Sequence, residues 1–130
     1  MTEPQLTVFI CRNALPPTQE EMPLGTSMVE LPCSGRIDEV TILRAMRQGA
    51  WDVVVVGCLE GNCKHHSGCY QARRRVEAVR SILGQLNVDP ERVRMVNIAP
   101  NQQAKLRSTV REARERAIRA GPIRILEGDK

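Results

Sequence analysis

Aromatic residues are almost missing from this sequence, which holds one Phe, one Tyr and one Trp among 130 residues. The core must therefore be aliphatic, and the chain has too few rings to stack the bases of single-stranded nucleic acid. A large net charge is missing as well, because the formal net charge is only +4. A charge of this size does not by itself indicate nucleic-acid binding, and we expect no nucleic-acid partner.

Long apolar runs are missing too. The first four residues are polar, and the apolar run at 6–10 is far too short for a signal-peptide core or a membrane-spanning helix. We therefore expect a cytoplasmic protein with no membrane insertion. No repeat, low-complexity tract or linker divides the chain, so we expect a single domain at residues 1–121 and a short tail at 122–130.

Candidate strands and helices alternate along the chain. Short apolar runs predict strands at 6–10, 28–31, 53–56 and 92–98, and the unbroken valines of 53–56 are typical of a strand buried on both faces. Helical spacing predicts three helices, and Asp38 is the expected N-cap of the first. The apolar residues that mark them are Ile37, Val40, Leu43 and Met46 for the first, Ala72, Val76, Val79, Leu83 and Leu86 for the second, and Leu106, Val110, Ala113 and Ala117 for the third. This order predicts a three-layer α/β fold with a mostly parallel four-stranded sheet and helices on both faces.

A complete set of disulfides is not indicated, because the cysteines are odd in number: Cys11, Cys33, Cys58, Cys63 and Cys69. In a reducing compartment such a group favours metal binding or thiol chemistry. The first three cysteines each follow a predicted strand. Since ligands collect at the carboxyl ends of parallel strands, we expect these thiols to converge at that edge of the sheet. The loop that holds the other two cysteines should lie at the same edge.

The C-x2-C pairs that are usual in structural zinc sites are also absent. The C-x4-C step from Cys58 to Cys63, with further ligands arriving from other strand ends, favours a larger centre such as a [2Fe–2S] cluster. Three glycines of this loop allow the backbone to approach sulfur closely, so that amide N–H groups can tune a reduction potential. They are Gly57, Gly61 and Gly68.

Two alternatives stay open for the cysteine group. One is a zinc-binding structural or interaction module, and the other is a thiol-dependent enzyme that uses Cys58, whose pKa nearby cations would lower. Several residues close to the cysteines are expected to surround the metal ligands or to dock a partner protein. For the arginines, the alternative is that they simply lie on a solvent-exposed helix face. These residues are Arg36, His65, His66, Tyr70 and Arg73.

Three motifs follow one another in a fixed order. They are Cys-Ser-Gly-Arg at 33–36, Gly-Cys-x-x-Gly-x-Cys-x-x-x-Ser-Gly at 57–68, and Ala-x-x-Arg-Val-Glu at 72–77. Together with Pro-Glu-Arg-Val-Arg at 90–94, this combination resembles the delta subunit of methyl-viologen-reducing hydrogenase, a family also described as the hydrogenase iron–sulfur subunit. The resemblance covers roughly residues 6–118, which is essentially the whole domain.

The resemblance implies a [2Fe–2S] protein that passes electrons and has no substrate of its own. It implies a relay between a hydrogenase or dehydrogenase and a heterodisulfide-reductase-like flavoprotein subunit. The cysteines that match family cysteines are Cys11, Cys33, Cys58 and Cys63. The family often has a C-x-x-C pair after the first strand, where this chain has only Cys11, and it commonly has Asn in place of Cys69. Four of the five cysteines are thus expected as ligands, with zinc as the alternative metal.

Overall fold

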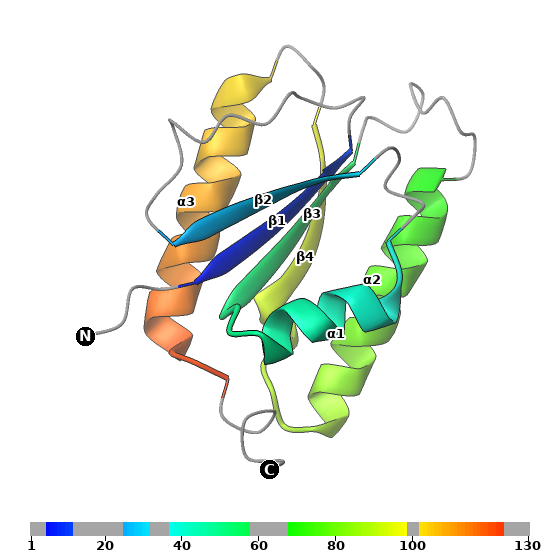
Figure 1. Cartoon of the computed structure of the whole chain (residues 1–130), viewed down its shortest axis with the longest axis vertical. Coiled ribbons are helices and arrows are strands. Elements are labelled where there is room, and N and C mark those ends of the chain that lie inside the picture. The colour runs from blue at the N-terminus through cyan, green and yellow to red at the C-terminus, as the bar shows by residue number, and fades with distance from the viewer. Residues whose placement is uncertain (1–4, 12–24, 32–36, 58–67, 99–101, 124–130) are drawn as a thin grey trace.

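The computed structural model describes residues 5–11, 25–31, 37–57, 68–98 and 102–123 (Figure 1). Along the chain these residues form β1 (Leu6–Cys11), β2 (Thr26–Leu31), α1 (Glu39–Arg47), β3 (Asp52–Gly57), α2 (Gly68–Gln85), the 3₁₀ helix η4 (Pro90–Arg92), β4 (Val93–Asn97) and α3 (Gln103–Ala120). Within these ranges, no helix is both long and apolar enough to cross a membrane.

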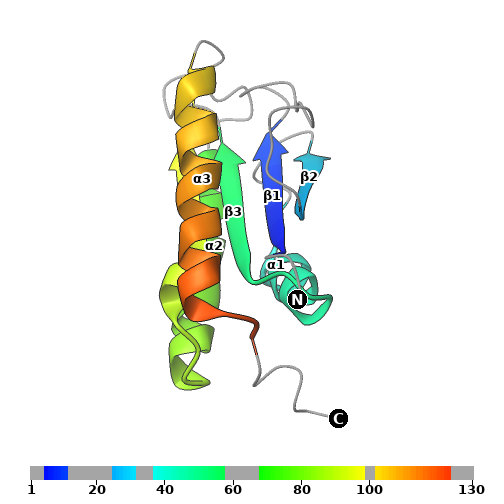
Figure 2. The ribbon, with the colours of Figure 1, turned by 90° about the vertical axis from the view of Figure 1, so that its left-hand side faces the viewer.

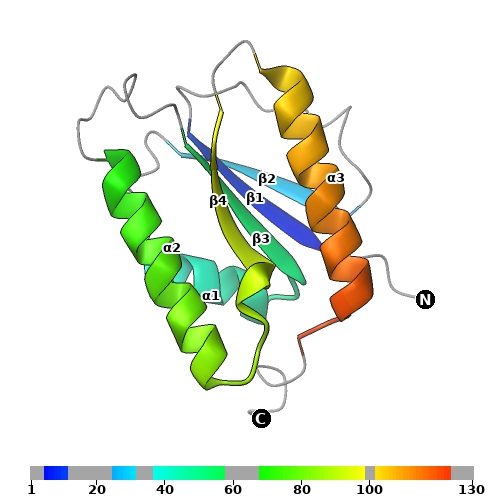
Figure 3. The same cartoon turned by 180° about the vertical axis from the view of Figure 1, so that it is seen from behind.

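The strands form one sheet in the order β2-β1-β3-β4, and every neighbouring pair is parallel. This confirms the predicted parallel four-stranded sheet. Because each connection returns the chain to the same end of the sheet, all the strands finish along one border (Figures 1 and 3). We call this border the carboxyl edge; the strand residues that mark it are Cys11, Leu31, Gly57 and Asn97. The opposite border is the amino edge.

Helices cover both faces of the sheet, as predicted. Side chains of α1 and α2 pack with Val53 and Val55 of β3 in one apolar cluster. Val54 and Val56 point the other way and pack with α3 in a second cluster. Figure 1 shows α3 on one side of the strands and α2 on the other, and in the turned view of Figure 2 α3 lies in front of α2. All six residues of β3 are buried, so the unbroken valine run marks a strand covered on both faces.

Helix α1 begins as the sequence predicts. Its N-cap is Asp38, whose Oδ1 accepts hydrogen bonds from the backbone N–H and the hydroxyl of Thr41 at 2.8 and 2.7 Å. Shortly after the helix ends, Gly49 has a φ of 119°, a conformation that L side chains rarely adopt.

The predicted buried face of α1 was partly wrong. Val40 is 61% exposed, whereas Ile42 and Met46 are buried. Residues two apart on a helix differ by about 200° in direction, so Val40 lies almost opposite Ile42. The helix therefore carries two apolar stripes, and sequence spacing alone did not distinguish the stripe that packs on the sheet.

The last strand is shorter than predicted. Residues 90–92 form η4 instead of extending β4, because Pro90 starts a 3₁₀ turn that is capped by Asp89. The Asp89 Oδ1 accepts a hydrogen bond from the N–H of Glu91 at 2.9 Å. β4 is an edge strand of the sheet, and only Val93 of its five residues is fully buried.

Candidate metal centre

The strand ends that lead to cysteines are neighbours in the sheet. Cys11 is the last residue of β1, β2 ends at Leu31 two residues before Cys33, and β3 ends at Gly57 immediately before Cys58. β1 lies between the other two strands, and the Cα of Cys11 pairs with that of Leu31. Since neighbouring strands are about 4.8 Å apart, the three ends span roughly 10 Å.

The start of α2 lies at the same edge. The Nη2 of Arg73 donates a 2.6 Å hydrogen bond to the Oδ1 of Asn97, the last residue of β4. Gly68 and Cys69 are the first residues of this helix, one turn before Arg73. The helix therefore carries the backbone of Cys69 toward the carboxyl edge, as expected for the loop's last cysteine.

Asn97 joins three elements at this edge. Its backbone oxygen accepts a 2.9 Å hydrogen bond from the Nζ of Lys105 on α3, while its side chain accepts from Arg73 on α2. It also pairs with Gly57, and the N–H of Ile98 donates to the Gly57 oxygen at 2.8 Å. The strand end that leads into Cys58 is thus fixed by α2, α3 and β4 together.

Sequence reasoning missed Asn97 and Lys105 as residues of this edge. A signal was present, because Asn97 is the last residue but one of the fourth predicted strand and so belongs to the same border as the cysteines. A neutral amide at the end of a strand is common in proteins, so the sequence alone does not single out Asn97.

Arg75 makes a second connection near the edge. Its Nη1 donates a 2.7 Å hydrogen bond to the backbone oxygen of Ile37, just before α1. Ile37 is itself buried in the apolar cluster under α1 and α2. The bond ties α2 to the segment that follows Cys33 and Arg36 in the chain.

Several predicted site residues lie outside the described residues. They are Cys33, Arg36, Cys58, Gly61, Cys63, His65 and His66. For Cys11, Gly68, Cys69 and Tyr70 the structure describes the backbone within β1 and α2. Among the side chains that are described, no three His, Cys, Asp or Glu residues come together as a metal site. The ligand set therefore stays a prediction.

The donor chemistry nevertheless fits a thiolate-bound centre. Cysteines follow the ends of three adjacent strands, and a fourth is in the first turn of α2. In the described residues at this edge, the charged side chains that donate hydrogen bonds are the cations Arg73, Arg75 and Lys105. Positive charge at this border suits an anionic metal–thiolate centre.

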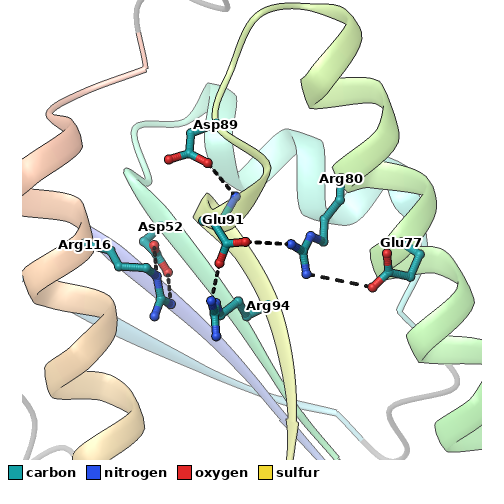
Figure 4. Close-up of polar contacts among 7 residues, drawn as sticks. All are labelled: Asp52, Glu77, Arg80, Asp89, Glu91, Arg94 and Arg116. Atoms are coloured by element: carbon teal, nitrogen blue, oxygen red, sulfur yellow. Dashed lines mark hydrogen bonds and ion pairs between the residues drawn. The ribbon is translucent and has the colours of Figure 1, made fainter.

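The amino edge holds a different charged group, which is shown in Figure 4. Asp52 begins β3 with a fully buried side chain, and its carboxylate accepts hydrogen bonds from Nε and Nη2 of Arg116 at 3.2 and 3.1 Å. Burial raises the pKa of Asp52 to about 7, although the hydrogen bonds and charge of Arg116 oppose this rise. The pair joins α3 to β3.

Glu91 and Arg92 complete this charged group. The carboxylate of Glu91 accepts hydrogen bonds from Arg94 and, at 3.0 Å, from Arg80 of α2 (Figure 4). The hydrogen bond from Arg94 is the main reason that the pKa of Glu91 is lowered. Arg92 is only 8% exposed and donates to the backbone oxygens of Trp51, Ala120 and Gly121. These residues lie at the border away from the cysteines and connect helices to strands, so their role is structural.

The fold and the strand ends define a class of protein: a small parallel α/β domain with cysteines at or shortly after the ends of three adjacent strands, at the edge where such sheets bind ligands. Within that class, the chain belongs to the methyl-viologen-reducing hydrogenase delta subunit family, whose model matches residues 8–121. The family expected from the motifs is therefore confirmed.

Similar proteins agree with this assignment. An iron-sulfur subunit of the F420-non-reducing hydrogenase vhu of Methanopyrus kandleri is 35% identical over 79% of this chain and 78% of its own length. An iron-sulfur subunit of the F420-non-reducing hydrogenase of Archaeoglobus profundus is 33% identical over 88% of this chain and 78% of its own length. In Methanosarcina mazei, one subunit of the ferredoxin:CoB-CoM heterodisulfide reductase is 25% identical over 88% of this chain, but over only 14% of its own length.

Proposed function

We propose that this chain is a cytoplasmic electron-transfer subunit that carries a [2Fe–2S] cluster at its carboxyl edge. It relays electrons between a hydrogenase or dehydrogenase and a heterodisulfide-reductase-like flavoprotein subunit, and it has no substrate of its own. The relatives support this role, because they include hydrogenase iron-sulfur subunits and a heterodisulfide reductase subunit. One observation carries the proposal: β2, β1 and β3 are adjacent and parallel, so three cysteines follow neighbouring strand ends.

Four of the five cysteines would hold the cluster, with Cys11, Cys33, Cys58 and Cys63 as the first choice and Cys69 as the substitute. When bound, the cluster supplies reversible one-electron chemistry. The chain's own residues keep the thiolates together by fixing the strand ends. Arg73 and Lys105 hold Asn97, and Asn97 pairs with Gly57, so the entry to the cysteine loop has a fixed position.

Positive charge close to the carboxyl edge has a second role in this proposal. A cation stabilises the more negative, reduced form of a nearby centre, and hydrogen bonds to sulfur act in the same direction. Arg73, Arg75 and Lys105 supply that charge from two helices. The same side chains would meet an acidic surface on an electron-transfer partner.

The test is anaerobic purification followed by spectroscopy and metal analysis. We expect broad visible absorption that bleaches on addition of dithionite, with two iron and two sulfide per chain. A colourless, folded protein with stoichiometric zinc would overturn the proposal in favour of a zinc-binding module. Single Cys-to-Ser variants of all five cysteines then define the ligands. In four of these variants the visible spectrum should be lost or shifted, and in the fifth it should match that of the wild type.

A further inference from the structure

Helix α1 has more apolar surface than the sheet uses. Ile42 and Met46 face the core, while Val40 and Leu43 lie on a second stripe that is turned toward α2 and solvent. At 61%, Val40 has the highest exposed fraction of any large apolar side chain in the described part of the chain. A single exposed valine needs no explanation, but this one is part of a larger surface.

That surface is a groove between α1 and α2, which lie side by side in Figures 1 and 3. Its volume is about 660 Å³, and apolar residues from both helices form its floor: Val40, Leu43, Ile82 and Leu86. On α1, Val40, Leu43 and Arg47 recur at spacings of three and four, the pattern that one helix presents to another. No other described segment of the chain lines this groove.

The rim of the groove is cationic. Arg44 and Arg47 line it from α1, and both are exposed. Within the described residues, neither arginine is joined by an ion pair to a carboxylate. Two such arginines beside an apolar floor attract a ligand that combines apolar and acidic groups.

The groove is distinct from the candidate metal centre. Ile82 lies thirteen residues after Cys69 on the same helix, so about 20 Å of helix separates them. A partner bound at the Ile82 and Leu86 end of the groove would therefore leave the carboxyl edge accessible. Attachment to a complex and electron transfer would use different surfaces of the domain.

We propose that this groove docks an acidic, amphipathic helix of a partner protein in the electron-transfer complex. An apolar face of the partner helix fits the floor, and its acidic residues meet Arg44 and Arg47. A second copy of this chain is a poorer occupant, because the chain has a net charge of +4 and would bring like charges together. The inference rests on the proposed function in one respect, that the chain works within a complex.

Two pairs of variants test the groove against matched controls. Val40→Glu places a charge on the floor, and Ile118→Glu makes a similar change at a 56% exposed position on α3. Arg47→Glu reverses a charge in the last turn of α1, and Arg119→Glu does the same in the last turn of α3. Circular dichroism and urea unfolding show that each variant is folded before binding is compared.

The measurement is the amount of partner retained when the tagged chain is purified in its complex, followed by the dissociation constant for the retained partner. We expect Val40→Glu and Arg47→Glu to raise the dissociation constant at least tenfold, and both controls to change it less than twofold. Equal retention in all four variants overturns the proposal, as does a wild-type chain that purifies alone. If Val40→Glu loses binding but Arg47→Glu does not, the proposal that the partner helix is acidic is overturned.

A photo-crosslinker identifies the occupant directly. With Val40 replaced by p-benzoylphenylalanine, the expected crosslink is to a partner segment whose sequence is helical, amphipathic and acidic. A crosslink to residues 124–130 of the same chain, or to a second copy, overturns the proposal. Visible absorption separates this result from the proposed function. If the wild type is coloured and the groove variants retain the partner as well as the wild type does, only the docking site is refuted. If the wild type is colourless and the groove variants lose the partner, only the cluster is refuted.

Discussion

Arg73 and Asn97 connect α2 to the end of β4 at the border of the sheet where the cysteines follow. The Nη2 of Arg73 lies 2.6 Å from the Oδ1 of Asn97, and Asn97 is the pairing partner of Gly57. Gly57 directly precedes Cys58. One side-chain hydrogen bond therefore links the second helix to the strand end that leads into the cysteine loop.

Replacing Arg73 with Ala should weaken this link. We expect the free energy of unfolding to fall by about 1 kcal/mol, the usual net value of one hydrogen bond with a charged donor at an exposed position. Urea unfolding of the metal-free protein measures the change. Arg74→Ala is the control, because Arg74 is exposed on the same helix, and its effect should stay within about 0.5 kcal/mol. Equal losses in the two variants would show that the bond to Asn97 adds nothing specific.

The two apolar stripes of α1 should differ sharply in their effect on stability. Ile42 is fully buried, so Ile42→Ala should cost about 2 to 4 kcal/mol through lost burial and a residual cavity. Val40→Ala should change the free energy of unfolding by less than about 0.5 kcal/mol, because Val40 is mostly exposed. Chemical denaturation of both variants decides this. A large loss in Val40→Ala would mean that the outer stripe is covered in the isolated protein.

Arg92 is expected to be the most sensitive charged residue outside the carboxyl edge. Its guanidinium donates to three backbone oxygens, of Trp51, Ala120 and Gly121, and so holds the end of α3 against the start of β3. Arg92→Met keeps much of the side-chain volume but removes every donor. We expect a loss of about 3 kcal/mol, since three acceptors are left without these donors at once. Thermal unfolding measures this loss, with Arg111→Met at an exposed position as the control. A loss below about 1 kcal/mol would show that Arg92 does not hold α3 against β3.

Asp52 should make stability depend on pH. Burial raises its pKa from 3.8 to about 7, so the folded chain holds this proton more tightly than the unfolded chain. Its contribution to stability is therefore complete below about pH 4 and is lost as the pH rises through about 7. Asp52→Asn removes this dependence while the other titrating groups stay the same.

The free energy of unfolding of both proteins, measured in urea at pH 5 and pH 8, gives the contribution of Asp52. The difference between wild type and Asp52→Asn should shift by on the order of 2 kcal/mol, with the wild type relatively weaker at pH 8. A shift of opposite sign would show that Arg116 lowers the pKa of Asp52 more than burial raises it.

The sequence predicted the architecture because period and composition report directly on burial. The run Val53–Val56 allowed only a strand covered on both faces, and alternation with helices then favoured parallel pairing. The spacing of Leu106, Val110, Ala113 and Ala117 likewise gave the buried stripe of α3. These signals are local, and they do not depend on which elements become neighbours.

Features that depend on a partner element were missed for the same reason. The choice between the stripes of Val40 and Ile42 is made by the sheet and by α2, not by α1 itself. Asp52 and Arg116 are 64 positions apart in the sequence, and no local sequence pattern predicts that they pair. Asn97 looks like an ordinary strand residue until the order β2-β1-β3-β4 places it beside Gly57. The ligand set among the five cysteines remains a prediction.

The position of β1 between β2 and β3 also dictates an order of events during biosynthesis. Leu6 pairs with Asp52, so β1 waits for residues about 46 positions later in the chain before its second neighbour exists. Parallel contacts over such separations form late and slowly in folding. In the nascent chain the strand ends that lead to the cysteines are far apart, and only formation of the sheet makes them neighbours. The proposed cluster would therefore be inserted after these strands have been translated, and the thiols would need reducing surroundings to protect them from oxidants until then.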